Sequence, residues 1–162
     1  MQYGSLVRAM HRLELLRKIR GRGVFAQAGL HPGQPPLLEY IRDHPGCTQK
    51  EAADELDVTP ASAAASLKRL EKAGLVARQM DSRDARRNRL TLTPEGQEKL
   101  EANRRAFDAL DKQMLSGLTE AEIAAFQKTC ATMFDNLADE STRSLTICRL
   151  HRAAFTPPEK EE

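Results

Sequence analysis

The sequence contains few aromatic residues and few cysteines. It has no tryptophan, Phe and Tyr make up 4% of the chain, and no aromatic residue lies between Ile41 and Phe107. Proteins that bind single-stranded nucleic acid stack bases on aromatic side chains, so this composition argues against that class. The three cysteines (Cys47, Cys130 and Cys148) are widely spaced. This spacing excludes a disulfide framework and fits a reducing compartment.

Long apolar runs and catalytic motifs are also missing. No stretch approaches the roughly 18 to 20 apolar residues of a membrane span, and Arg8 and Arg12 interrupt the region where a signal peptide would be apolar. We therefore expect a cytoplasmic protein that does not bind membranes. There is no Gly-rich phosphate loop, no Gly-x-Ser-x-Gly and no His-Glu-x-x-His. His44 and Cys47 have metal-ligand spacing, but two ligands do not make a site. We expect no enzymatic activity, no metal and no cofactor.

Charge is unevenly distributed, although the formal net charge is only +2. Residues 66–93 contain eight basic and three acidic side chains, whereas residues 94–142 contain five basic and ten acidic ones. A basic middle followed by an acidic segment indicates one surface for a polyanion and another for a different contact. Solvated helix surfaces would give a similar distribution, so charge alone does not decide.

Residues 47–74 have the signals of two short helices. Thr48 and Glu51 form a capping box that begins the first helix. Asp57-Val58-Thr59 is a tight turn, and Thr59 caps a second helix that has Pro60 at its first position. That helix ends at Gly74, a typical C-terminal glycine. Two short helices joined by about three residues predict a helix-turn-helix.

The flanking segments predict a hairpin and further helices. Strand-like runs at 75–79 and 89–93 flank a charged tip, and Pro94 opens a long helix in which Asn103 interrupts an apolar stripe. Thr119 and Glu122 cap a final helix. Before the motif we expect helices at about 5–20, weakened by glycines 21 and 23, and at 37–43. The fold class is mainly α: a winged helix-turn-helix with a two-stranded β-wing and a helical dimerisation region.

The motifs at Gly46–Arg78 and Asp81–Gly96 resemble the MarR family of bacterial regulators. They combine Leu70-Glu71, Gly74-Leu75-Val76, Asp84-x-Arg86 and Leu92-Thr93-Pro94-Glu95-Gly96. The resemblance covers about residues 5–140. It implies a homodimeric regulator that binds a pseudo-palindromic duplex operator. We divide the chain into an N-terminal dimerisation helix and loop (1–30), the DNA-binding domain (31–96), C-terminal dimerisation helices (97–142) and a tail (143–162), with a short helix and then disorder.

The predicted DNA contacts lie on helix starts, on the second helix of the motif and on the wing. Helix N-termini suit phosphates, small side chains permit close approach to the major groove, and arginines suit a narrow minor groove. On the second helix, Ala63, Ser66, Leu67 and Leu70 should face the core. The predicted contact residues are Thr48, Gln49, Lys50, Thr59, Ala61, Ser62, Ala64, Ala65, Lys68, Arg69, Arg83, Asp84, Arg86 and Arg87.

Regulation has several possible interpretations at this point. A repressor relieved by a small aromatic or anionic effector follows from the resemblance, which points to a crevice between the dimer helices and the DNA-binding lobe. The candidate effector residues are His11, Arg12, Leu15, His31 and Tyr40. An architectural DNA-binding protein without effector fits the alanine-rich recognition helix. A thiol-based redox-sensing regulator is a further alternative, because Cys47 precedes a helix N-terminus, where a thiolate is stabilised.

Overall fold

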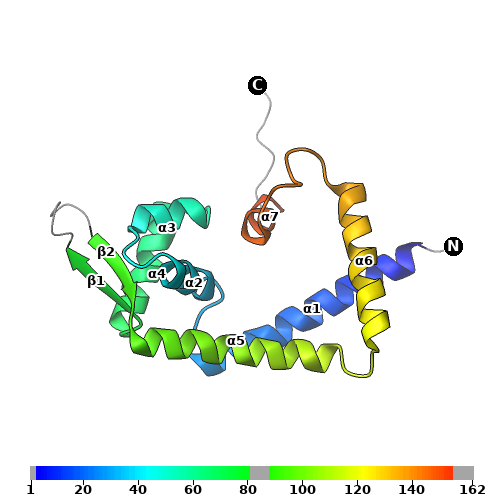
Figure 1. The fold of residues 1–162 in the computed structure, drawn as a ribbon, viewed down its shortest axis with the longest axis horizontal. Coiled ribbons are helices and arrows are strands. Elements are labelled where there is room, and N and C mark those ends of the chain that lie inside the picture. The colour runs from blue at the N-terminus through cyan, green and yellow to red at the C-terminus, as the bar shows by residue number, and fades with distance from the viewer. Residues whose placement is uncertain (1–2, 81–87, 155–162) are drawn as a thin grey trace.

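The computed structural model describes residues 3–80 and 88–154, which form seven helices and one two-stranded sheet (Figure 1). Helices α2 to α4 and the two strands make a lobe at one end of the long helix α5, and α6 lies at the other end (Figure 1). The elements are α1 (Tyr3–Ala28), α2 (Gln34–Asp43), α3 (Gln49–Glu55), α4 (Pro60–Lys72), β1 (Val76–Met80), β2 (Asn88–Leu92), α5 (Pro94–Met114), α6 (Glu120–Leu137) and α7 (Ile147–Ala153).

Helix α1 is longer than the sequence predicts. It continues through Gly21 and Gly23 to Ala28, although we expected these two glycines to weaken the helix. Gly21 is buried at the contact with α5, and a Cβ there would lie 3.1 Å from Cε1 of Phe107. The rings of Phe25 and Phe107 also pack, with centroids 4.9 Å apart. Packing against α5 thus outweighs the low helix propensity of glycine.

Helix α2 begins at Gln34 rather than at residue 37, and Pro35 and Pro36 lie in its first turn, where a missing N–H is harmless. The Oε1 atom of buried Gln34 accepts a hydrogen bond of 2.7 Å from the backbone N of His31. This bond satisfies a backbone donor in the turn before the helix.

The core lies inside the lobe and reaches the start of α5. Its largest fully buried side chains are Leu38, Ile41, Leu67, Leu70, Leu90 and Leu100. They come from α2, α4, β2 and α5 and belong to one cluster, so a single core joins the lobe to the start of α5. A fully buried Leu or Ile side chain contributes about 1.5–3 kcal/mol relative to exposure.

The strands pair antiparallel, with Val76 opposite Leu92 and Met80 opposite Asn88. Both strands are shifted by one residue from the predicted ranges. Gly46 and Cys47 add a short third segment, which the sequence did not indicate: the Gly46 N donates to the Leu90 O and the Leu90 N to the Cys47 O, each at 2.8 Å. The loop before α3 is thereby fixed to the wing.

A compact junction joins α4, the wing and α5. The backbone N of Thr93 donates to the Leu75 carbonyl at 3.1 Å, and the Thr93 hydroxyl donates to the Gly74 carbonyl at 2.7 Å. The same hydroxyl accepts from the Gly96 N at 2.9 Å and so caps α5. A Cβ on Gly96 would overlap the carbonyl oxygen of Leu75. Only glycine permits this approach of the two backbones.

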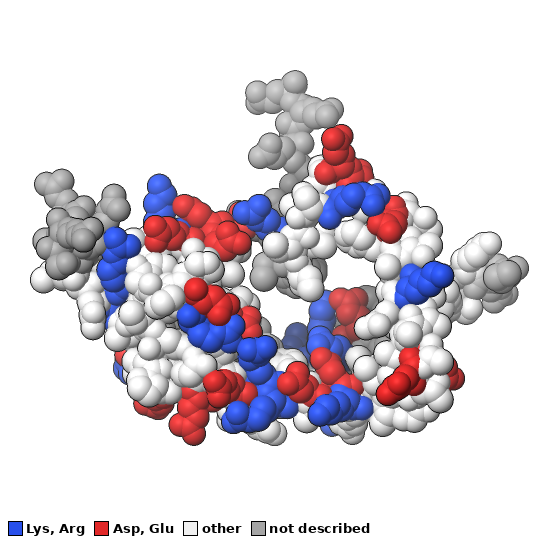
Figure 2. Space-filling model, in the orientation of Figure 1, with Lys and Arg blue, Asp and Glu red and all other residues white. Residues whose placement is uncertain are grey.

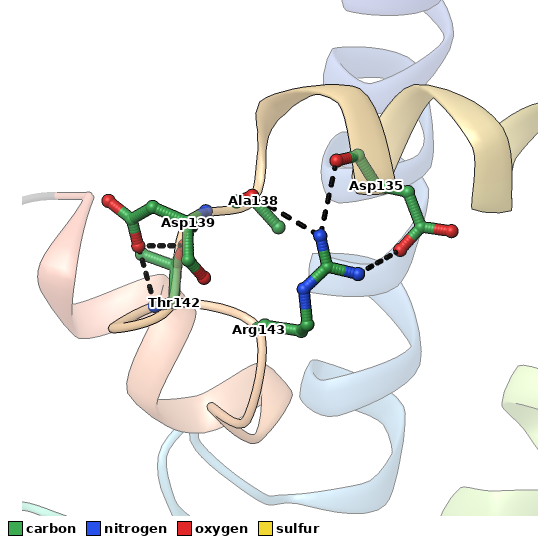
Figure 3. Close-up of polar contacts among 5 residues, drawn as sticks. All are labelled: Asp135, Ala138, Asp139, Thr142 and Arg143. Atoms are coloured by element: carbon green, nitrogen blue, oxygen red, sulfur yellow. Dashed lines mark hydrogen bonds and ion pairs between the residues drawn. The ribbon is translucent and has the colours of Figure 1, made fainter.

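The chain after α6 is held by a polar turn (Figure 3). Arg143 forms an ion pair with Asp135 at 2.8 Å and donates to the carbonyls of Asp135 and Ala138 at 3.4 and 3.5 Å, which satisfies acceptors at the end of α6. Asp139 accepts hydrogen bonds from Ser141 and Thr142, which lower the pKa of its carboxyl to about 2. Helix α7 follows this turn.

Gly96→Ala should lower the free energy of unfolding by about 1–3 kcal/mol, because the added methyl must displace backbone. Gly23→Ala is the matched control: no atom of the described residues lies within 4 Å of a Cβ at that position, and the change should raise the free energy of unfolding by about 0.5–1 kcal/mol through helix propensity. Urea unfolding at one protein concentration measures both. Equal effects of the two substitutions would contradict the steric role of the junction.

Candidate nucleic-acid interface

The helix-turn-helix is built as its capping signals predict. Thr48 and Glu51 form a reciprocal capping box on α3, and the Thr59 hydroxyl accepts from the Ser62 N at 3.2 Å on α4. Between the helices Asp57 has a φ of +50°, which aspartate tolerates better than most residues. The Val58 N donates to the Ala53 O at 3.0 Å and closes the turn. The relative position of the two helices is therefore set by short-range bonds.

Helix α4 has one buried face and one open face. Ala63, Leu67 and Leu70 are buried, and Ser66 is half-buried. Most of the predicted contact residues on the other side are exposed, while Ala64 is half-buried; the exposed ones are Thr59, Ala61, Ser62, Ala65, Lys68 and Arg69. The open face thus combines small side chains with two cations, a shape that admits close approach to a groove.

The predicted contact residues at the start of α3 differ in exposure and in the hydrogen bonds that their side chains already form within the protein. The Thr48 hydroxyl accepts from the Glu51 N at 3.2 Å, and Thr48 is half-buried. The Gln49 side chain accepts from Arg78 at 3.5 Å. Lys50 is exposed. Two of these three side chains therefore already serve the local structure, although capping does not prevent a contact to phosphate.

Arg78 links the wing to both helices of the motif, a role that the sequence analysis missed. Its Nε donates to Oε1 of Glu71 on α4 at 2.8 Å, and its Nη2 lies 2.7 Å from the same oxygen. The third partner is Gln49 on α3. About 30% of the Arg78 and Glu71 side-chain surface is exposed. Because charge counts treat Arg78 only as part of a basic segment, they cannot reveal this link.

The structure describes only some of the wing arginines. Arg83, Asp84, Arg86 and Arg87 lie outside the described residues. Arg89 is described, and its Nη1 donates to the Gly46 carbonyl at 3.0 Å. Arg89 therefore fixes the base of the wing to the loop before α3.

The five candidate effector residues are spread over α1, the turn before α2 and α2 itself. Arg12 and Leu15 border an apolar surface depression formed by α1 alone, and His11 lies 3.9 Å from Glu14 on the same helix. His31 lies in the turn before α2. The Tyr40 ring stacks on His44 with centroids 4.3 Å apart. A different cavity, bounded by α1, α2 and α5, contains none of these five side chains.

The environment of the Cys47 thiol disfavours its thiolate form. Cys47 is buried, and burial, together with Glu51, raises the pKa of its thiol. We expected a helix N-terminus to stabilise the thiolate, so this expectation is corrected: desolvation disfavours the charged form.

Figure 2 shows acidic and basic side chains interspersed along α5 on the face that it presents. Among residues 3–80 and 88–154 no group of three or more His, Cys, Asp or Glu side chains is arranged to hold a metal ion. Within the same ranges no helix is both long and apolar enough to span a bilayer.

The chain is similar to transcriptional regulators both in its sequence and in its fold. The family model described as MarR family matches residues 28–87. The transcriptional regulator HosA of Escherichia coli O127:H6 is 30% identical over 129 residues, covering 79% of this chain and 96% of HosA. The transcriptional repressor MdtR of Bacillus subtilis is 33% identical over 95 residues, covering 59% of this chain and 61% of MdtR. A point mutant of S. aureus MepR bound to an oligodeoxyribonucleotide superposes with a TM-score of 0.65 at 26% identity, covering 85% of this chain and 99% of that one.

Glu71→Ala tests whether Arg78 positions the wing. It removes a negative charge, which by itself would strengthen binding to a polyanion. If the link orients the wing, the substitution should instead weaken duplex DNA binding about fivefold, which corresponds to about 1 kcal/mol, the upper range for a surface ion pair. Glu98→Ala on exposed α5 makes the same charge change and is the control. Fluorescence anisotropy with labelled duplex at fixed salt measures both; tighter binding by Glu71→Ala would contradict the positioning role.

Proposed function

Because the chain belongs to the MarR family of DNA-binding transcriptional regulators, we propose that it acts as a homodimeric repressor whose binding to a pseudo-palindromic operator is relieved by a small-molecule effector. The observation that carries this proposal is the open face of α4. That face presents small residues and the cations Lys68 and Arg69, while Leu67 and Leu70 on the opposite side anchor the helix in the core. A relative, MdtR, is named a repressor, which supports repression as the mode of action.

We propose that the DNA contacts are those predicted from the sequence. Lys50, Lys68 and Arg69 then neutralise phosphates, and Ala61, Ser62 and Ala65 approach base edges in the major groove. The wing residues Arg83, Arg86 and Arg87 are assigned to the neighbouring minor groove, where negative potential attracts arginine, and Asp84 is assigned to hold Arg86 in position by a charge-assisted pair. A helix in each of two adjacent major grooves requires two copies of the motif.

Selection of duplexes from a random pool tests the DNA-binding part. We expect a pseudo-palindrome with half-sites about one helical turn, or roughly 10–10.5 base pairs, apart. Affinity should fall with salt with a log–log slope of about −0.9 per phosphate neutralised. Equal affinity for single strands, or no dependence on salt, would contradict this function.

The dimer is proposed from apolar surface that the protomer leaves open. Helix α6 has no buried residue within the described chain, although it carries an apolar stripe that includes Phe126 and Phe134. Helix α1 exposes large apolar side chains along most of its length; they are Tyr3, Leu6, Val7, Met10, Leu13, Leu15, Leu16 and Ile19. Figure 2 shows the molecule hollowed between the lobe and α6. Exposed large apolar side chains in this number are typical of an interaction site, and we propose that a second copy covers both helices.

Sedimentation should give about twice the 18.1 kDa of one chain, as expected for a closed two-fold dimer. Leu16→Glu should shift the equilibrium toward monomer, because the interface would have to desolvate an unpaired charge. Gln27→Glu, on the same helix at a polar exposed position, is the control and should leave the mass unchanged. A wild-type monomer at low micromolar concentration would contradict the dimer.

A further inference from the structure

The contact between α1 and α5 joins the apolar surface assigned to the dimer with the lobe that carries the recognition helix. Helix α1 bears most of the exposed apolar side chains that a second copy is proposed to cover. Helix α5 begins in the core of the lobe, to which Leu100 belongs. The two helices cross and are in contact (Figure 1). Their crossing angle therefore fixes where the lobe lies relative to the dimer surface.

The two helices meet at successive turns. Gly21 of α1 lies against the ring of Phe107 on α5. One turn further along each helix, Arg17 grips Asp111 with two hydrogen bonds: Nε donates to Oδ1 at 2.9 Å and Nη2 donates to Oδ2 at 3.0 Å. A single contact would let α1 rotate about that point, whereas two contacts one turn apart define its direction against α5.

Apolar packing is loose beyond the ion pair. Leu13 and Met114, about one turn further along the two helices, border a cavity of about 280 Å³ that is also lined by Leu16 and Leu110. Leu13 is 46% exposed and Met114 is 37% exposed. This space leaves α1 room to swing relative to α5, since closely packed side chains are what prevents such movement. The planar, bidentate Arg17–Asp111 pair is therefore well placed to limit it.

The length of α5 enlarges any change of angle at the pair. Leu100 and Asp111 lie about 16 Å apart along the helix, at a rise of about 1.5 Å per residue. A rotation of about 10° at Asp111 therefore moves the lobe core by about 3 Å, which is close to the rise of about 3.4 Å per base pair in duplex DNA. In a symmetric dimer both lobes move, so a small rotation changes the spacing of the two recognition helices.

We propose that Arg17 and Asp111 are positioning residues that set which half-site spacing the dimer accepts. They act through the orientation of the helices, not through contact with DNA. This inference rests on the proposed function and deepens it, because it assigns operator spacing to residues outside the helix-turn-helix. The Arg17 and Asp111 side chains are 45% and 37% exposed. Such a pair favours one orientation by at most about fivefold, corresponding to about 1 kcal/mol.

The test uses duplexes that carry the selected half-sites at the selected spacing or one base pair further apart. Fluorescence anisotropy at fixed salt gives the ratio of the two affinities. Arg17→Ala and Asp111→Ala should each lower this ratio about fivefold, mainly by tightening binding to the longer duplex, because the ion pair no longer has to break. The two substitutions change the charge in opposite directions, so a purely electrostatic effect on DNA binding cancels in the ratio.

Two further variants separate geometry from charge and from stability. Arg17→Lys keeps the charge but replaces the planar fork by a single ammonium, so it should also lower the ratio. Arg105→Ala is the matched control, because it removes a cation whose partner, Glu101 at 3.9 Å, lies on the same helix. It should leave the ratio unchanged. Sedimentation of each variant should show a dimer.

The outcomes distinguish this inference from the function on which it rests. A wild type that selects a pseudo-palindrome, with Arg17→Ala and Asp111→Ala variants that keep its spacing preference, overturns the inference and leaves the regulator intact. An unchanged ratio in Arg17→Lys, or a lowered ratio in Arg105→Ala, also overturns it. Dissociation of the two alanine variants into monomers assigns the pair to assembly and overturns its role in spacing. A wild type that selects no duplex contradicts the function and the inference together.

Discussion

The arrangement of the DNA-binding surface depends on the close approach of two backbones, at Leu75 and Gly96. The Leu75 carbonyl accepts from the Thr93 N, and the Thr93 hydroxyl bonds both the end of α4 and the start of α5. Three elements that have different tasks therefore meet within a few residues. This contact explains why the motifs Gly74-Leu75 and Thr93-Pro94-Glu95-Gly96 occur together in the sequence. The first segment supplies two carbonyl acceptors. The second supplies the Thr93 hydroxyl and, at Gly96, the absence of a side chain that lets the two backbones approach.

Helix α5 extends this junction toward the rest of the molecule. Its first turns belong to the lobe core through Leu100, and its later turns pack on α1 through Phe107 and Asp111. One rigid helix thus carries both the base of the wing and the support for α1. Any change at the contact of α1 and α5 is transmitted along a helix, and a helix resists bending better than a loop. The buried amide of Asn103 lies between these two regions, where α5 leaves the lobe core.

The sequence predicted those parts of the fold that local chemistry determines. Thr48, Thr59 and Thr119 cap helices as their spacing indicates, because a cap needs only the side chain and the next three residues. Two of the missed features are set by contacts distant in sequence: α1 passes through Gly21 because Phe107 packs there, and Cys47 pairs with Leu90 in the wing. The link from Arg78 to Glu71 spans seven residues but joins a strand to a helix, so the periodicity of either element alone does not reveal it. At the candidate site the exposed face of α4 followed from periodicity, whereas the burial that raises the Cys47 pKa did not.

The small side chains of α4 explain why so many bonds serve to position it. Alanine contributes to base recognition only through contact with thymine methyl groups, and few residues on the open face can form bidentate hydrogen bonds. Such a surface gains from shape and close approach, and these gains are lost when the helix is displaced by a fraction of an ångström. A helix with long polar side chains could adapt by changing rotamers, but Ala61 and Ala65 cannot. Under the proposed assignment of DNA contacts, the capping of Thr59, the Arg78–Glu71 pair and the Thr93 junction hold the backbone of α4 in the position that such close approach requires.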